Sequence, residues 1–260
     1  MTTPLYTPTL CHSPAYQLNW SYTLFWREVP PTDLTLEALQ IATEPDGIRI
    51  LQHEHTHPKV SQFLISTRPE IAPKTIAQRV KGRLQHLIRK NVPKAFQRNY
   101  ALRSIGSTRR SKLEAYLESQ LDHHPNADPT FTERLEALQL SNREVDFESY
   151  QETTHARYWH NLHIVLVNEC RYREGDLDRL TAMRSMLVKA ASKKGHQIGH
   201  VAMLPDHLHF LLRASLVESP QNIVLAYMNN LAYAVGQKSI FAPSYFVGTF
   251  SEYDLGAIPS

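Results

Sequence analysis

Two segments of this chain, far apart in the sequence, share one pattern without a gap, and this repeat limits the folds that the chain can adopt. The first is Pro58–Pro73 (PKVSQFLISTRPEIAP) and the second is Pro205–Pro220 (PDHLHFLLRASLVESP). Both begin and end with proline, and both carry Phe-Leu at the same place, at 63–64 and 210–211. Their identity is low, so we infer a duplicated domain from the shared spacing and from the order of the elements around it.

Hydrophobic periodicity and turn residues predict the same order twice: strand, helix, strand, strand, helix, strand. In the first half we expect strands at Tyr16–Arg27, Ile48–Leu51, Val60–Ser66 and Tyr100–Ile105, helices at Asp33–Ile41 and from Pro73 to Pro93, and a further helix capped by Ser107. In the second half we expect strands at Trp159–Asn168, His200–Met203, His207–Leu212 and Tyr245–Phe250, and helices at Asp176–Lys193 and Ser219–Gln237.

The segment between the two halves has a different character. From Leu121 to His155, eight acidic residues stand against two Lys or Arg, and prolines interrupt the pattern. We interpret it as a linker with a short helix near Phe131–Leu140. The predicted fold is α+β, with two ferredoxin-like domains of antiparallel sheet arranged as an internal pseudo-dimer. The expected divisions are residues 1–121, 122–156 and 157–260.

Composition excludes some classes of protein. Apolar residues make up 42% of the chain, which is enough for globular domains. No run approaches the roughly 20 apolar residues of a membrane helix, and the start has no secretory pattern, so we expect a cytoplasmic protein with no membrane partner. Cys11 and Cys170 are the only cysteines and are expected to be free thiols.

Positive charge is concentrated in one stretch, although the net charge is only +3. Between Lys74 and Lys112 there are twelve Lys or Arg and no acid, with Phe96 and Tyr100 interleaved. Such a stretch can be a solvated helix face, but the complete absence of acids favours nucleic acid. The candidate DNA-binding residues are Lys74, Arg79, Lys81, Arg83, Arg89, Lys90, Arg98, Arg103, Arg109 and Arg110.

The triplet His207-Leu208-His209 is a candidate metal site. On a strand, side chains alternate, so the two imidazoles share one face while Leu208 packs on the other. Imidazole favours Mn, Fe, Co, Ni or Zn over Mg, although Mg is compatible when phosphate oxygens complete the shell. Two alternating histidines are also common without any metal, so the surrounding sequence has to decide.

The surrounding sequence, LPDHLHFLL from Leu204 to Leu212, resembles the signature of the HUH single-tyrosine transposases, which include insertion-sequence transposases and REP-associated tyrosine transposases. Pro205, Asp206 and the His-Leu-His triplet match that signature position by position. The family's tyrosine lies on a later helix as Tyr-x-x-x-Gln after a turn with Ser and Gly. The segment SIGSTRRSKLEAYLESQ supplies this pattern in the first half, and the resemblance implies that Tyr116 is the nucleophile and Gln120 the third metal ligand.

The overlay of the two repeats puts Val60 and Gln62 where the second half has its histidines. One half therefore has the tyrosine and the glutamine, and the other has the two histidines. Family members typically act as dimers that share such sites, so the resemblance implies a fused pseudo-dimer, monomeric in solution, with one composite site. The implied activity is metal-dependent cleavage and transfer of single-stranded or hairpin DNA, with Mg or Mn as the cofactor and a covalent phosphotyrosine intermediate.

Other residues compete for these roles. His53, His55 and His57 alternate and are an alternative metal site, and His160 and His163 could border the main site or simply pack. His123 and His124 are expected on the surface of the linker. Tyr253 is a rival nucleophile, but no Gln follows it at the required spacing.

Two other functions remain open at this point. One is a catalytically inactive, domesticated transposase derivative that binds DNA hairpins. The other is a metal-dependent hydrolytic nuclease that uses the histidines without a covalent step.

Overall fold

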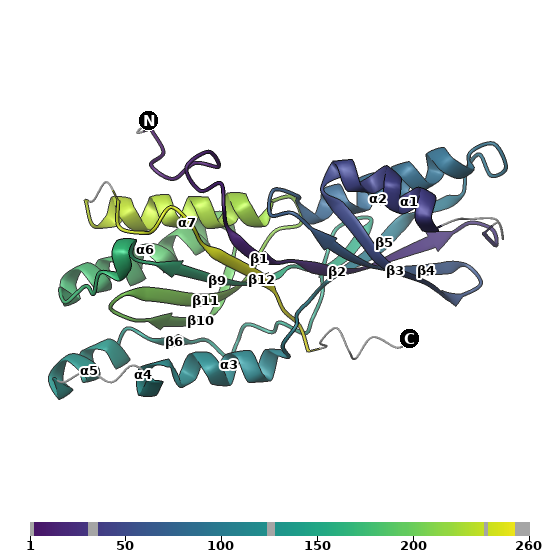
Figure 1. Ribbon diagram of the computed structural model, residues 1–260. Coiled ribbons are helices and arrows are strands. Elements are labelled where there is room, and N and C mark those ends of the chain that lie inside the picture. Colours follow the sequence, from purple (N-terminus) through teal and green to yellow (C-terminus); the bar gives the residue numbers. More distant parts are fainter. Residues whose placement is uncertain (1–2, 31–35, 124–127, 237–238, 253–260) are drawn as a thin grey trace.

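The computed structural model describes residues 3–30, 36–123, 128–236 and 239–252 (Figure 1). It is a mixed α+β protein with two six-stranded sheets that lie end to end, and helices pack on both sheets. This agrees with the predicted fold class.

The first half folds in the predicted order. The elements are β2 (Asn19–Trp26), α1 (Leu36–Thr43), β3 (Ile48–His57), β4 (Val60–Thr67), α2 (Pro73–Ile88) and β5 (Phe96–Ile105), with a short 3₁₀ helix at Glu44–Asp46. Gly47, with φ of 74°, ends that 3₁₀ helix in the left-handed conformation that glycine adopts without strain. Alternate residues of β2, including Trp20, Tyr22 and Trp26, pack against α1 and α2 to form this half's core.

The second half repeats the order. The elements are β9 (Asn161–Val167), a 3₁₀ helix (Glu169–Arg171), α6 (Leu177–Lys194), β10 (Gln197–Met203), β11 (His207–Arg213), α7 (Pro220–Ala234) and β12 (Phe246–Thr249). The side chain of Asp176 caps α6 by accepting hydrogen bonds from the backbone N–H groups of Asp178 and Arg179. Gln237, the expected end of the last helix, lies outside the described residues.

The remaining elements join the two halves. Helix α3 (Arg110–Glu118) and the short α4 (Gln120–His123) follow β5, and the segment after them contains α5 (Pro129–Glu136), β6 (Leu140–Ser141) and β7 (Gln151–Glu152). The prediction that Ser107 caps α3 is wrong. The helix begins at Arg110, and the Ser107 hydroxyl instead donates to Gln17 Oε1 over 2.8 Å.

Each half contributes a strand to the other half's sheet. The predicted strand Tyr16–Arg27 is two strands: β1 (Ala15–Gln17) pairs in parallel with β12 of the second half, and β2 lies in the first sheet. In the same way, β8 (Ala156–Trp159) pairs in parallel with β5 of the first half, and β9 lies in the second sheet. The sheets are therefore antiparallel except at these two exchanged strands.

The junction between the halves is symmetric at the level of single hydrogen bonds. The backbone N–H of Asn19 donates to Thr249 Oγ1 over 2.9 Å, and that of Asn161 donates to Ser104 Oγ over 3.2 Å. Ser104 in turn donates to the carbonyl of Phe250, and Thr249 to that of Ile105. Such reciprocal contacts are those of an isologous interface, so the chain is built as an internal pseudo-dimer.

The second sheet is covered on both faces. Helices α6 and α7 pack on one face, and α3, which follows the first half's last strand, lies along the other (Figure 1). Leu113 and Leu117 of α3 pack against Leu211 and Phe250. All seven residues of β11 are consequently buried.

Candidate active site

The two histidines of the triplet lie on the face of β11 that α3 covers. Strand β11 is central in its sheet, between β9 and β10. Leu208 and Phe210 point into the core under α6 and α7, so His207 and His209 point the other way, with 5.1 Å between their ring centroids. This alternation is the one that the sequence predicted.

Tyr116 reaches this face from α3. Its ring meets the ring of His209 edge-on, with 5.8 Å between centroids and 78° between planes. The side chain is 47% exposed. The tyrosine of the first half thus lies beside a histidine of the second half and is accessible to a large substrate.

Gln120, one turn after Tyr116, is buried and has one unsatisfied oxygen. Its Nε2 donates to the Tyr116 carbonyl over 3.1 Å. Its Oε1 is buried without a hydrogen-bond partner among the described residues. Such an acceptor costs free energy unless a further group satisfies it, and amide oxygens are ligands for Mg and Mn. The Oε1 atom of Gln120 is therefore suited to bind a metal ion.

The Nδ1 atom of His207 is held by Asp206. The distance from His207 Nδ1 to Asp206 Oδ1 is 2.7 Å, and Arg171 donates to the other carboxylate oxygen over 3.3 Å. Burial opposes ionisation of Asp206, but the hydrogen bonds and positive charges of His207 and Arg171 outweigh it and lower the pKa of this carboxyl group. A carboxylate at Nδ1 fixes the ring so that His207 would bind a metal through Nε2.

The Nδ1 atom of His209 is held by His163 of β9. His163 Nε2 lies 3.1 Å from His209 Nδ1, and the two rings stack with 17° between their planes. Burial lowers the pKa of His163 to about 4, so this ring is neutral near pH 7 and its Nε2 can accept a hydrogen bond from the N–H of His209 Nδ1. His209, too, would then bind a metal through Nε2.

Comparison with known proteins gives a family match for the segment that contains the two histidines. Residues 156–259, which include the His-Leu-His triplet, match the family described as "Transposase IS200 like". This segment of the chain is therefore similar to the IS200-like transposases. Tyr116 and Gln120 lie outside the matched segment. No curated protein is similar enough to this chain to match it.

Three solved structures give more distant likenesses. A candidate transposase from Deinococcus radiodurans R1 is 20% identical over 35% of this chain and 79% of its own, with a TM-score of 0.33. A REP-associated tyrosine transposase bound to a REP hairpin is 14% identical over 36% of this chain and 58% of its own, with a TM-score of 0.32. A protein of unknown function from Galdieria sulphuraria is 7% identical over 90% of this chain and 97% of its own, with a TM-score of 0.22.

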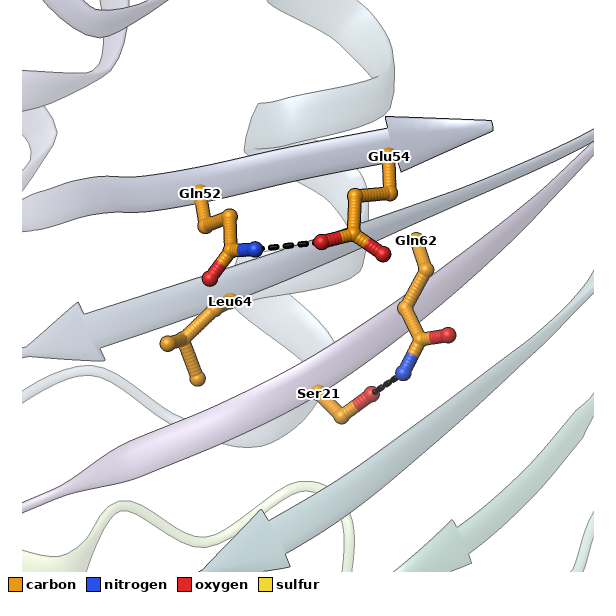
Figure 2. Close-up of a pocket in the computed structure, with 5 residues that line it drawn as sticks. All are labelled: Ser21, Gln52, Glu54, Gln62 and Leu64. Carbon is orange, nitrogen blue, oxygen red and sulfur yellow. Dashed lines mark hydrogen bonds between the residues drawn. The ribbon is translucent and has the colours of Figure 1, made fainter. Parts of the chain in front are cut away.

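The first sheet has no histidine at the positions that correspond to His207 and His209 of the triplet. In the strand pairing, Val60 and Gln62 face Phe25 and Thr23 as His207 and His209 face Val167 and Val165. Figure 2 shows what lies there instead: the Gln62 amide donates to Ser21 Oγ, and the Gln52 amide contacts Glu54. Ser21 stands where the second half has His163, because each faces the matching leucine of the repeat.

The basic residues predicted to bind DNA have varied surroundings. Arg79 and Arg83 pair with Asp46, and Arg110 lies among Glu114, Glu148 and Glu252. Arg103 lies over the Trp159 ring at 4.2 Å, and Arg109 precedes the first residue of α3. Arg89 follows α2 directly, with Lys90 next to it.

Three of these basic residues share a cleft. Lys74, Lys81 and Arg98 line a hollow of about 570 Å³, together with Tyr100 and Tyr158. Lys81 also donates to the Gln97 carbonyl, and burial lowers its pKa. This cleft combines positive charge with aromatic surface.

The other histidines and the rival tyrosine named from the sequence lie in different surroundings. On β3, the His53 ring stacks on Phe63, and burial lowers its pKa to about 4, while His55 Nδ1 lies 3.2 Å from Ser61 Oγ. His160 is buried against Trp20 and its Nδ1 bonds the Ser215 carbonyl, so it packs between the halves, whereas His163 borders the triplet. Tyr253, His124 and the side chain of His123 lie outside the described residues.

Two further findings concern metals and membranes. Within the described part of the chain, no three or more His, Cys, Asp or Glu side chains form a group that could hold a metal ion. The ligand set predicted from the resemblance contains two histidines and the amide of Gln120, so it is not a group of that kind. No helix of the described ranges is long and apolar enough to cross a membrane. Cys11 and Cys170 are free.

Proposed function

We propose that this chain cleaves and rejoins single-stranded DNA through a covalent link to Tyr116. The observation that carries the proposal is the contact between Tyr116 and His209, because it joins the tyrosine of one half to the triplet of the half that is similar to the IS200-like transposases. The chain would act as one pseudo-dimer with one composite site.

His207, His209 and Gln120 would hold a divalent ion, Mg or Mn. The buried, unpartnered Oε1 of Gln120 supports this set, as do the Nδ1 contacts that turn both histidines towards binding through Nε2. When bound, the ion would polarise a nonbridging phosphate oxygen and offset the charge that develops there. His163 and Asp206 would keep the two rings in place.

The Tyr116 oxygen would attack the phosphorus atom of a phosphodiester. The new bond joins that oxygen to phosphorus, the bond from phosphorus to the 3′ oxygen breaks, and the phenolic proton is lost as the 3′ hydroxyl forms. The product is a 5′ phosphotyrosine and a free 3′ end. Because the adduct conserves the phosphoester bond, a 3′ hydroxyl can reverse the step without ATP.

The substrate would be single-stranded or hairpin DNA. The attack by Tyr116 needs a DNA backbone that can bend into the site, which a single strand does readily. The cleft of Lys74, Lys81 and Arg98 would hold phosphates by charge, with Tyr100 and Tyr158 as stacking surfaces.

The experiment is to incubate the protein with labelled single-stranded DNA and Mg²⁺ or Mn²⁺ and to look for a denaturant-resistant adduct. We expect an adduct with the wild type and with Tyr172→Phe, which alters another exposed tyrosine, and none with Tyr116→Phe. Binding without cleavage would favour an inactive, hairpin-binding derivative. Cleavage that persists in Tyr116→Phe would favour a hydrolytic nuclease.

A further inference from the structure

A pocket opens beside Tyr116, between α3 and the edge of the second sheet. It has a volume of about 380 Å³, and its walls include Lys112, Tyr116, His163, Phe246 and Gly248. Small-molecule sites have volumes of roughly 300–1,000 Å³, so this hollow is large enough for a small organic group. Both Tyr116 and His163 belong to the candidate active site, which makes the pocket continuous with it.

The floor of the pocket is the aromatic ring of Phe246, and Gly248 leaves room for that ring. Phe246 is half-buried, and its ring meets the ring of His163 edge-on at 5.5 Å. A Cβ atom at Gly248 would lie 3.0 Å from Cζ of Phe246, closer than side chains normally approach. The absence of a side chain at 248 therefore lets the Phe246 ring lie across the strand and present its surface to the pocket.

The rim of the pocket carries positive charge. Lys112 precedes Tyr116 by one helical turn, so both side chains project from the same face of α3. Lys112 is exposed and forms no ion pair with the residues that the structure describes, and the pocket walls contain no acid. An anionic group that entered beside Tyr116 would meet this ammonium group.

We infer that the pocket receives the nucleoside next to the phosphate that Tyr116 attacks, with the base against Phe246 and a neighbouring phosphate at Lys112. The inference rests on the proposed function, because it takes single-stranded DNA as the substrate. An aromatic floor accepts any base, since every base has a π face. The pocket would thus position the strand at the cleavage point and add to its affinity with little sequence preference.

Photocrosslinking tests the location. The probe is random-sequence single-stranded DNA with 5-iododeoxyuridine in place of thymidine, bound to the Tyr116→Phe protein so that no phosphotyrosine adduct interferes. We expect a crosslink in the peptide that contains Phe246, and its loss in Phe246→Leu. Crosslinks only at other peptides would overturn the inference.

Binding measurements with the same DNA test the contributions of the two side chains. Phe246→Leu should weaken affinity about 5- to 150-fold, which is what stacking of one base on one ring contributes. Lys112→Gln should reduce the slope of log affinity against log salt by about 0.7, the value for one phosphate contact with a single strand. The controls are Phe131→Leu on α5 and Lys189→Gln on α6. Unchanged affinity in Phe246→Leu and an unchanged slope in Lys112→Gln would each contradict the inference.

Two further measurements keep the outcomes distinct. Thermal unfolding of each variant checks that the fold is retained, and Gly248→Ala should weaken binding in a second way, because its Cβ displaces the Phe246 ring. The adduct assay on the wild type is scored separately. A crosslink at Phe246 without any adduct would support the pocket and refute the proposed reaction, and an adduct without that crosslink would do the reverse.

Discussion

The ring of Tyr116 stands edge-on to the ring of His209, although the two residues come from different halves of the chain. The contact exists because α3 leaves the first sheet and lies on the second, where Leu113 and Leu117 bury their side chains. The tyrosine of the first half and the histidines of the second half thereby meet within one polypeptide.

The hydrogen bond between His209 and His163 predicts that His163 contributes to metal affinity. His163→Leu removes the hydrogen-bond partner of His209 Nδ1, so the His209 ring loses its fixed orientation. Loss of such a partner typically lowers metal affinity by about 10- to 100-fold. Titration calorimetry with Mn²⁺ measures the effect. Ser21→Ala, at the matching position of the first sheet, is the control and should change nothing. An affinity equal to that of the wild type in His163→Leu would count against this role.

If Gln120 is a metal ligand, replacing it should change how much Mn²⁺ stabilises the protein without lowering its stability in the absence of metal. Gln120→Met removes the buried, unpartnered oxygen, so without metal the free energy of unfolding should be no lower than that of the wild type. The stabilisation that Mn²⁺ gives the wild type, about 2.7 kcal/mol at a concentration of 100 times Kd, should be largely lost.

Gln139→Met is the matched control for that comparison. Both ends of the Gln139 amide are hydrogen-bonded, to Met203 among others, so this variant should be destabilised but should keep the metal response. If Gln120→Met behaves in the same way as Gln139→Met in thermal unfolding with and without Mn²⁺, Gln120 is a structural residue rather than a ligand.

The symmetric junction predicts equal costs on its two sides. Ser104→Ala leaves the Asn161 N–H and the Phe250 carbonyl without their partner, and Thr249→Val does the same to Asn19 and Ile105. Each change should lower the free energy of unfolding by about 1–3 kcal/mol in urea denaturation.

Ser244→Ala removes an exposed hydrogen bond to the Ser13 carbonyl and should cost less than either junction variant. A junction variant that is as stable as Ser244→Ala would show that these reciprocal bonds do not hold the halves together.

The sequence predicted the order of elements because that order follows from local periodicity. It did not predict that Tyr16–Arg27 divides at Leu18 into strands of two sheets, because the exchange of β1 and β8 is decided by contacts between the halves. It also ended the strand from Ile48 too early. Polar residues such as Glu54 continue β3 to His57, since its register is maintained by pairing with β4.

As with the fold, the sequence predicted some features of the candidate site and missed others. Spacing on a strand predicted that the two histidines of the triplet share one face, and the family resemblance pointed to Tyr116 and Gln120 on their helix. The contact of His163 with His209 and the place of Phe246 beside Tyr116 depend on strand register and on the path of α3, which the residues themselves do not encode locally. Asp206 belonged to the recognised signature, but its bond to His207 emerged only from the structure.

The central claim is that one chain completes one site. Its most direct test is to mix Tyr116→Phe protein, which keeps the triplet, with His207→Ala protein, which keeps the tyrosine, and to measure DNA adduct formation relative to the wild type. Because Tyr116 contacts His209 within the same polypeptide, we predict that the mixture restores almost no adduct. Efficient restoration would mean that the tyrosine serves the triplet of another molecule, and it would contradict the account.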